Sequence, residues 1–236
     1  MLSISNVSFK YNKRAVLDSV SVVINSGDCL AIVGESGSGK STLLKLAFGQ
    51  MDVDAGAISW KDKPILGPKN KLVVGHDFMK YVAQEFDLMP YTSVSENIGD
   101  YLSNFYPEEK KGRVNELIEV VELQGFENTK VQFLSGGQKQ RISIARALIR
   151  KPNILILDDC LSAVDTETEK QILSNINKIT AGKTTIIVSH RVSSAKNADH
   201  IIVLNDGVII EQGSHEELIS NEGYYKELYK NQLQEI

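Results

Sequence analysis

The sequence is poor in cysteine. Only Cys29 and Cys160 occur among its 236 residues. Their spacing is typical of neither a metal site nor a disulfide framework. We therefore expect two reduced, mostly buried thiols in a cytosolic protein, which argues against a disulfide-stabilised secreted domain.

The sequence also lacks an excess of basic charge and any long apolar run. Lys and Arg number 26 against 30 Asp and Glu, a net charge of −4, so no footprint for nucleic acid is expected. No apolar run approaches the roughly 20 residues that span a bilayer. The opening "MLSISNVSFK" has no apolar stretch like that of a signal peptide. We expect no direct membrane insertion.

What is present suits one large soluble domain. The length allows a sizeable core, and hydrophobic residues make up 42% of the chain. Two full domains are not expected at this length, although one domain with an additional lobe is. The whole chain, 1–236, is therefore taken as a single domain.

The order of strand-like and helix-like segments predicts an α/β fold with a mainly parallel sheet. A β-hairpin subdomain comes first, and a helical lobe of about 85–135 is inserted in the middle. The expected strands are 2–10, 16–24, 29–33, "AISW", "KLVVG", 153–158, 184–189 and 200–204, followed by a hairpin from "NDG" into "VIIEQG". The expected helices are 94–105, 107–123, 136–150, 165–180 and the tail 214–234.

A glycine-rich segment, "GESGSGKS", follows the apolar strand 29–33 and leads into a helix. Gly34, Gly39, Lys40 and Ser41 match the phosphate-binding pattern G-x-x-x-x-G-K-[ST]. Backbone N–H groups of such a loop and of the helix start can surround anionic oxygens. Lys40 would then reach the β- and γ-phosphates, and the Ser41 hydroxyl would bind Mg²⁺.

Two adjacent carboxylates end the apolar strand in "NILILDDCLSAVD". In a parallel sheet, ligands bind at the carboxyl ends of the strands. Alone, the pair would usually be a solvated strand end. Beside a phosphate loop, Asp158 is expected to hold the magnesium shell, and Asp159 to face the attacking water.

The segment "LSGGQKQR" provides a second helix N-terminus suited to an anion. Ser135, Gly136 and Gly137 offer a hydroxyl and accessible backbone N–H groups there. Since the chain has one phosphate loop, we expect this second terminus to act on the nucleotide of another chain.

Together these motifs resemble the nucleotide-binding domain of ATP-binding-cassette transporters along essentially the whole chain. "GESGSGKS" resembles its Walker A motif, "LSGGQ" its signature and "ILILDD" its Walker B. The resemblance implies a P-loop NTPase core that binds ATP and Mg²⁺, pairs with a second nucleotide-binding domain and serves a membrane-spanning domain. It also implies a cytoplasmic location at the inner face of a membrane, through that partner.

The resemblance implies further site residues. Tyr11 would stack on adenine, Gln84 would contact Mg²⁺ and the water, and Asp165 would lie in the loop that contacts the opposite subunit. His190 would be the switch histidine at the γ-phosphate. The phosphate-loop set also includes Gly37, Ser38 and Thr42, and the signature set includes Gln138.

Two departures from the family pattern are visible. The two ends of the chain resemble exporters, whereas "YVAQEFDLMPYTSVSENIG" resembles importers and stand-alone cassettes, so a recombined or engineered mosaic is one hypothesis. Asp159 stands where the family usually has Glu as general base. Some exporter chains with Asp here bind ATP but hydrolyse it poorly, paired with a different chain that keeps Glu.

These features predict a slowly hydrolysing ATPase that dimerises around ATP and powers transport. Two alternatives remain at this stage. A soluble, ATP-switched cassette protein would usually carry a coiled-coil insertion, a second cassette or a basic surface. A phosphoryl-transfer kinase on the same scaffold would have no use for "LSGGQ".

Overall fold

A six-stranded sheet with strand order β10-β9-β3-β8-β7-β6 forms the centre of the protein. The structure is a computed structural model and describes residues 1–85, 87–189 and 191–234. Neighbouring strands are parallel except β9 and β10. The strands are β3 (Cys29–Val33), β6 (Met79–Val82), β7 (Ile154–Asp158), β8 (Thr184–Val188), β9 (His200–Asn205) and β10 (Val208–Gly213). The expected α/β class and mainly parallel sheet are confirmed.

Strand β7 lies in the interior of this sheet and is buried along its whole length. Ile154 and Ile156 face one apolar cluster, and Leu155 and Leu157 face another on the opposite side. An uninterrupted apolar run is what burial on both faces requires. The strand delivers Asp158 to the carboxyl edge of the sheet.

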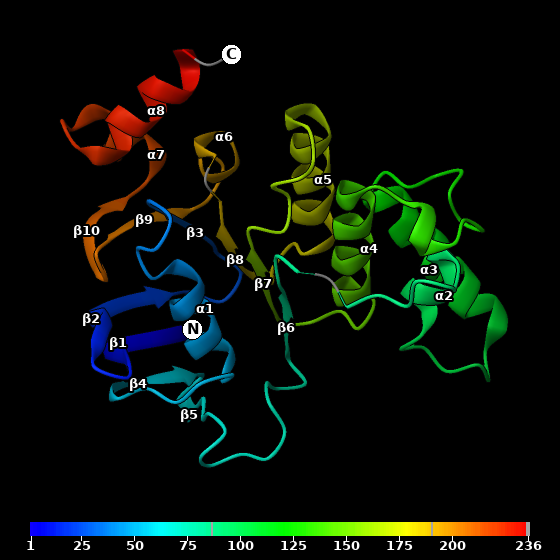
Figure 1. Cartoon of the computed structure of the whole chain (residues 1–236), viewed down its shortest axis with the longest axis horizontal. Coiled ribbons are helices and arrows are strands. Elements are labelled where there is room, and N and C mark those ends of the chain that lie inside the picture. The colour runs from blue at the N-terminus through cyan, green and yellow to red at the C-terminus, as the bar shows by residue number, and fades with distance from the viewer. Residues whose placement is uncertain (86, 190, 235–236) are drawn as a thin grey trace.

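The second sheet is antiparallel, with strand order β2-β1-β4-β5. Its strands are β1 (Leu2–Tyr11), β2 (Arg14–Ile24), β4 (Ala55–Trp60) and β5 (Lys63–Pro64). Helix α1 (Lys40–Phe48) shares one buried cluster with this sheet and with the central sheet, and Figure 1 shows it between them. The expected antiparallel subdomain is therefore present.

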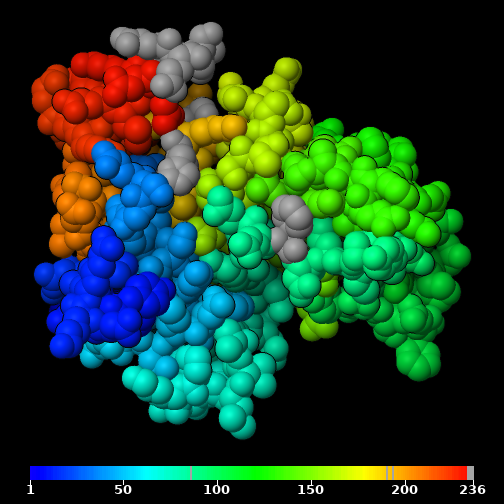
Figure 2. Space-filling view, in the orientation of Figure 1, coloured from blue at the N-terminus to red at the C-terminus, as the bar shows by residue number. Residues whose placement is uncertain are grey.

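The helical lobe projects to one side of the sheets, at the right in Figures 1 and 2. It contains α2 (Val94–Gly99), α3 (Pro107–Val120) and the short 3₁₀ helix η1 (Val131–Phe133). Its apolar residues belong to the same buried cluster as those of α4 (Gly136–Leu148) and α5 (Thr166–Ile179). The lobe is thus packed onto the helices beside the central sheet.

The C-terminal part completes the covering of the central sheet. Helices α6 (Val192–Ala195), α7 (His215–Ser220) and α8 (Tyr224–Gln234) follow β8 and β10. Val192, Leu218 and the fully buried Tyr225 pack with residues of β3 and β9. The predicted helical tail is therefore two helices, interrupted around Gly223.

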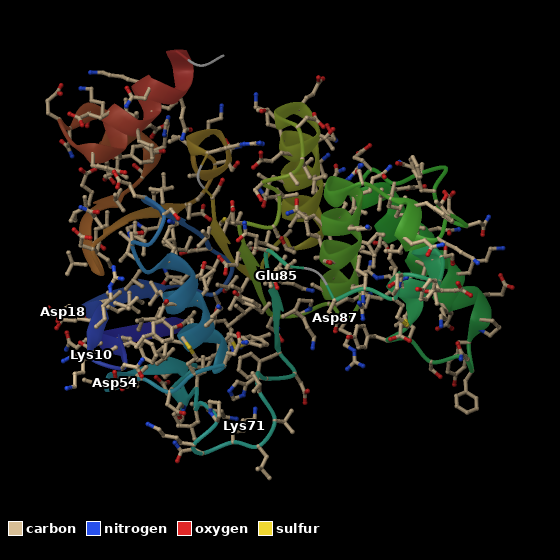
Figure 3. The ribbon with its side chains drawn as sticks, viewed as in Figure 1. Lys10, Asp18, Asp54, Lys71, Glu85 and Asp87 are labelled. Carbon is tan, nitrogen blue, oxygen red and sulfur yellow. The ribbon has the colours of Figure 1, made fainter. Side chains whose placement is uncertain are left out.

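One predicted strand is wrong. The segment 71–75, "KLVVG", is irregular, and Leu72, Val73 and Val74 are all exposed. Figure 3 labels Lys71 in this loop, which extends away from the sheets before β6. Its β-branched residues favour a strand, but strands are stabilised by a paired neighbour, and β6 takes the place beside β7.

The two helices of the lobe end earlier than predicted, and α4 ends at Leu148 rather than at 150. Helix α2 ends at Gly99 rather than at residue 105, and the sequence that follows is rich in turn-forming Asp, Ser and Asn. Helix α3 ends at Val120 rather than at 123, because Glu122 adopts a left-handed conformation with φ 56°. A backbone N–H of Leu123 then donates to the carbonyl of Ile118 and closes the helix end.

Within the described ranges, the helices are all too short or too polar to cross a lipid bilayer.

Candidate functional site

The phosphate loop joins β3 to α1 through three glycines with positive φ. Gly34, Gly37 and Gly39 have φ of 146°, 85° and 106°. A Cβ on Gly34 would lie 2.1 Å from the carbonyl oxygen of Leu204, and one on Gly39 would lie 2.8 Å from a methyl of Leu17. Glycine is therefore required by both conformation and close packing.

Helix α1 begins directly after Gly39, so its first N–H groups lack intrahelical partners. Its first turn carries no acidic residue, and the first helical hydrogen bond runs from Leu43 N–H to Gly39 O. Ser38 and Thr42 are nearly buried beside it. The loop and the helix dipole together form an anion-binding terminus.

Lys40 places its ammonium inside this loop. Its side chain is buried, and Nζ donates to the carbonyls of Gly34 at 2.9 Å and Glu35 at 2.5 Å. Burial lowers the Lys40 pKa, while the carboxylates of Asp159, Asp158 and Glu35 oppose that shift. The loop therefore holds the positive charge of Lys40 at the place where phosphate oxygens would bind.

A second group of oxygen atoms lies beside the start of α1. Ser41 Oγ donates to Asp158 Oδ1 at 2.8 Å, and Asp158 is only 4% exposed. The hydroxyl of Tyr81, on the neighbouring strand β6, donates to the other oxygen, Oδ2, at 2.5 Å. Burial and this hydrogen bond raise the Tyr81 pKa, so the phenol stays protonated and donates.

These donors fit Mg²⁺. They are hard oxygens, and no cluster of three or more His, Cys, Asp or Glu side chains able to hold a metal occurs in the described part of the chain. Mg²⁺ is commonly held by one or two protein ligands together with substrate phosphates and water, rather than by an all-protein cage. Ser41 and Asp158 provide that kind of partial site.

Asp159 follows Asp158 in the sequence, but the backbone turns away from strand β7 at this residue. Its φ is 48°, a left-handed value that Asp tolerates better than most residues, and its N–H donates to Val188 O at 3.2 Å. This turn separates the two carboxylates, so that Asp158 bonds to Ser41 whereas Asp159 lines the adjoining pocket.

That pocket has a volume of about 670 Å³ and gathers residues from distant parts of the sequence. Tyr11 comes from the end of β1, Gln84 from just after β6, and Asp159 from the end of β7. Tyr11 is 46% exposed, and its hydroxyl donates to Met51 Sδ at 3.4 Å. The lining residues are Tyr11, Arg14, Ala15, Val16, Ser36, Gly37, Gly39, Lys40, Ser41, Thr42, Gln84, Asp159, Val188, Asp206 and Gly207.

The signature segment does not line this pocket. Ser135 is the N-cap of α4, where its hydroxyl accepts from Gln138 N–H at 3.2 Å and its own N–H donates to Gln138 Oε1 at 2.9 Å. Ser135 and Gly136 are exposed. A Cβ on Gly137 would lie 2.7 Å from Ala163 O, which places the loop after β7 against this helix start.

Asp165 also lies outside the pocket, at the start of α5. It is exposed, and its carboxylate accepts from Thr168 N–H at 2.9 Å, which lowers its pKa. Ala163 N–H in the same loop donates to Gln140 Oε1 at 3.2 Å. The loop 162–165 is thus fixed against α4. His190, the predicted switch histidine, lies outside the described residues.

Some features of the site could not be predicted from the sequence. Arg14, Val16, Asp206 and Gly207 complete the pocket wall, and Gly207 N–H donates to Ser38 O in the phosphate loop at 3.1 Å. Tyr81 stands three residues before Gln84, but its contact with Asp158 depends on the pairing of β6 with β7. The sequence shows that a tyrosine stands at position 81, but not that its hydroxyl reaches Asp158.

Known proteins are similar to this chain in sequence and in fold. The family model described as "ABC transporter" matches residues 17–162. A "Probable multidrug resistance ABC transporter ATP-binding/permease protein" of Bacillus subtilis is 40% identical over 97% of this chain and 40% of its own length. The chain thus spans about two fifths of that relative.

Two solved structures are similar in fold. A bacterial Atm1-family ABC exporter with ATP bound matches with a TM-score of 0.85 and 33% identity, over 98% of this chain and 42% of that one. An ATP-binding cassette in a dimeric post-hydrolysis state with ADP and phosphate matches with a TM-score of 0.79 and 29% identity, over 91% of this chain and 98% of that one. The chain therefore belongs to the ABC transporter family and has the fold of its ATP-binding cassette.

Proposed function

We propose that this chain is the ATP-binding and ATP-hydrolysing motor domain of a membrane transporter. The observation that carries the proposal is that the phosphate loop, Gln84 and Asp159 line one pocket, together with Ser41, which is hydrogen-bonded to Asp158. Family membership supports it, and so does the match over nearly the whole length of a cassette solved with ADP and phosphate.

In this proposal each part of the pocket has a task. Lys40 and the N–H groups at the start of α1 bind the β- and γ-phosphates, and the exposed Tyr11 ring receives the adenine. Ser41 and Asp158 hold Mg²⁺, with Gln84 beside them. When bound, the cation supplies charge neutralisation at the phosphate oxygens. Asp159 accepts the proton of the attacking water.

We further propose that hydrolysis is slow because Asp159 is one methylene shorter than Glu. A general base must be within hydrogen-bond reach of its water. Misplacement by about 1 Å can cost on the order of 100-fold in rate. The shorter side chain should not weaken nucleotide binding, because the proposed contacts to the phosphates and to Mg²⁺ come from Lys40, Ser41 and Asp158 and not from Asp159.

Two chains are proposed to enclose the nucleotides between them. Ser135 and Gly136 are exposed at a helix start that does not reach the pocket of its own chain. Bringing that terminus to the pocket of a second cassette gives each nucleotide two anion-binding helix ends. Asp165 and its loop then lie near the contact with the other subunit. The partner is a second copy or a related chain.

A membrane-spanning partner is proposed to dock at the junction of the lobe with β6. A groove of about 350 Å³ lies there, lined by charged residues that include Glu85, Asp87 and Arg146. Figure 3 labels Glu85 and Asp87 between β6 and the lobe. Through this partner the domain would lie at the cytoplasmic face of a membrane.

Light scattering of the Asp159→Asn protein, in which hydrolysis is slowed, tests the shared site. ATP with Mg²⁺ should increase the measured mass, and adding Ser135→Phe should weaken this increase while the affinity of the monomer for ATP stays nearly intact. Ser214→Phe is the matched control, because Ser214 caps α7 with the same hydrogen-bond pattern away from the pocket. Loss of ATP binding by the Ser135→Phe monomer would contradict a site on another chain.

A further inference from the structure

The carboxylate of Asp158 is held by a different hydroxyl on each of its oxygens. Ser41 Oγ donates to Oδ1 at 2.8 Å, and Tyr81 donates to Oδ2 at 2.5 Å. The Asp158 side chain is 4% exposed, so little water competes with these donors. The two oxygens are therefore not equivalent: one faces the start of α1, and the other faces β6.

Tyr81 is itself fixed in place by its surroundings. Strand β6 is parallel to β7, with Tyr81 opposite Ile156, so its side chain reaches the end of β7, where Asp158 lies. Its ring stacks on that of Phe48 in α1, with centroids 5.5 Å apart and an angle of 29° between the planes. A hydroxyl carried by a stacked ring on a paired strand has little freedom to leave Oδ2.

This arrangement restricts how Asp158 can meet a cation. Ca²⁺ accepts bidentate carboxylates and six to eight ligands in flexible geometry, whereas Mg²⁺ requires six ligands at shorter, nearly ideal octahedral positions. A phenol held on Oδ2 competes with a cation for that oxygen, whereas Ser41, the donor on Oδ1, is itself an expected ligand of the cation, so Oδ1 is the oxygen more readily offered. One-oxygen contact suits Mg²⁺ and removes an option that favours Ca²⁺.

We propose that Tyr81 is a positioning residue that limits Asp158 to one oxygen toward the cation, and that the nucleotide site thereby prefers Mg²⁺ to Ca²⁺. This inference rests on the proposed function, since it concerns the cation that accompanies ATP. Tyr81 does not line the nucleotide pocket and acts through Asp158.

The test is the dependence of ATP binding on each cation. Tyr81→Phe removes only the hydroxyl and keeps the ring that stacks on Phe48. ATP binding is measured by calorimetry with EDTA, then across titrations of Mg²⁺ and of Ca²⁺, which gives the half-saturating concentration of each cation. Affinity for ATP in EDTA should stay unchanged.

In Tyr81→Phe the half-saturating concentration of Mg²⁺ should rise about tenfold. This is the lower end of the loss of metal affinity that follows removal of a hydrogen-bond partner of a metal ligand. The response to Ca²⁺ should stay the same or improve, so the preference for Mg²⁺ falls. Tyr225→Phe is the matched control. It deletes another buried tyrosine hydroxyl, which lies 2.8 Å from His215 Nδ1, and should leave both titrations unchanged.

An unchanged ratio of the two half-saturating concentrations, in a folded Tyr81→Phe protein, would overturn the role of Tyr81. If Tyr81→Phe does not fold by circular dichroism, Phe48→Leu is measured instead. It removes the stacking partner and keeps the hydroxyl, so a smaller shift in the same direction is expected, and none would count against the inference. A parent protein that binds no ATP with either cation would refute the proposed function itself.

Discussion

Lengthening Asp159 by one methylene should accelerate ATP hydrolysis. Asp159 lines the pocket together with Lys40 and Gln84, at the turn that leaves β7. Asp159→Glu advances the carboxylate by roughly 1 Å, a displacement that can be worth on the order of 100-fold. We expect turnover to rise about 10- to 100-fold, equivalent to about 1.4–2.7 kcal/mol of barrier, with little change in affinity for ATP.

The backbone at this position sets a cost for the same change. Asp159 has φ 48°, and Glu tolerates left-handed conformations less well than Asp. We expect Asp159→Glu to lose about 1 kcal/mol of stability, which corresponds to a Tm lower by about 2–4 °C for a chain of this size. If Asp159→Glu is more active although it is less stable, the gain in rate comes from the position of the base and not from a more stable protein.

The assay is steady-state phosphate release at saturating ATP and Mg²⁺, with Asp159→Asn as the control that keeps the size of the side chain and removes the base. Asp159→Asn should fall below the parent protein. Equal rates for the parent and Asp159→Glu, or a rate for Asp159→Asn that matches the parent, would remove Asp159 from the mechanism.

Other predictions follow from burial and packing. Burial raises the Cys29 pKa to about 12, so alkylation of this thiol in the native protein should be slow at pH 8. The rate of alkylation should increase as pH rises or when the protein unfolds. Fast labelling of the native protein at pH 8 would contradict the burial of Cys29. Arg191→Ala leaves the buried Glu169 without its ion-pair partner. Because Arg191 is partly exposed, we expect the free energy of unfolding in urea to fall by about 1–2 kcal/mol. An unchanged free energy of unfolding would mean that the pair is not formed in solution. If the lobe at 85–135 comes from a different lineage, hydrogen exchange should be fastest at its junctions, and protection equal to that of β7 would argue against a poorly docked lobe.

The sequence predicts best where local pattern decides structure. The phosphate loop was predictable because its conformation requires glycine at Gly34 and Gly39, and both lie with Lys40 within one short segment. The double-sided burial of β7 was predictable for the same kind of reason, since an uninterrupted apolar run has few other solutions.

The sequence fails where strand pairing or local termination decides. "KLVVG" has strand propensity but no ladder in the described structure, because β6 occupies the place beside β7. The end of α2 at Gly99 reflects turn-forming residues that the helical pattern alone does not weigh. The contact from Tyr81 to Asp158 joins neighbouring strands 77 residues apart in sequence. The role of His190 and the mixed-lineage hypothesis stay predictions.

Equilibrium binding of ATP with Mg²⁺ to the purified chain tests the central claim most directly. Calorimetry should show about one ATP bound per chain, and Lys40→Ala should weaken binding strongly, because it removes a charge-assisted contact to the phosphates. Both proteins should remain folded. Absence of binding by the parent protein at millimolar ATP, or the same affinity in Lys40→Ala, would contradict the assignment of this pocket to ATP.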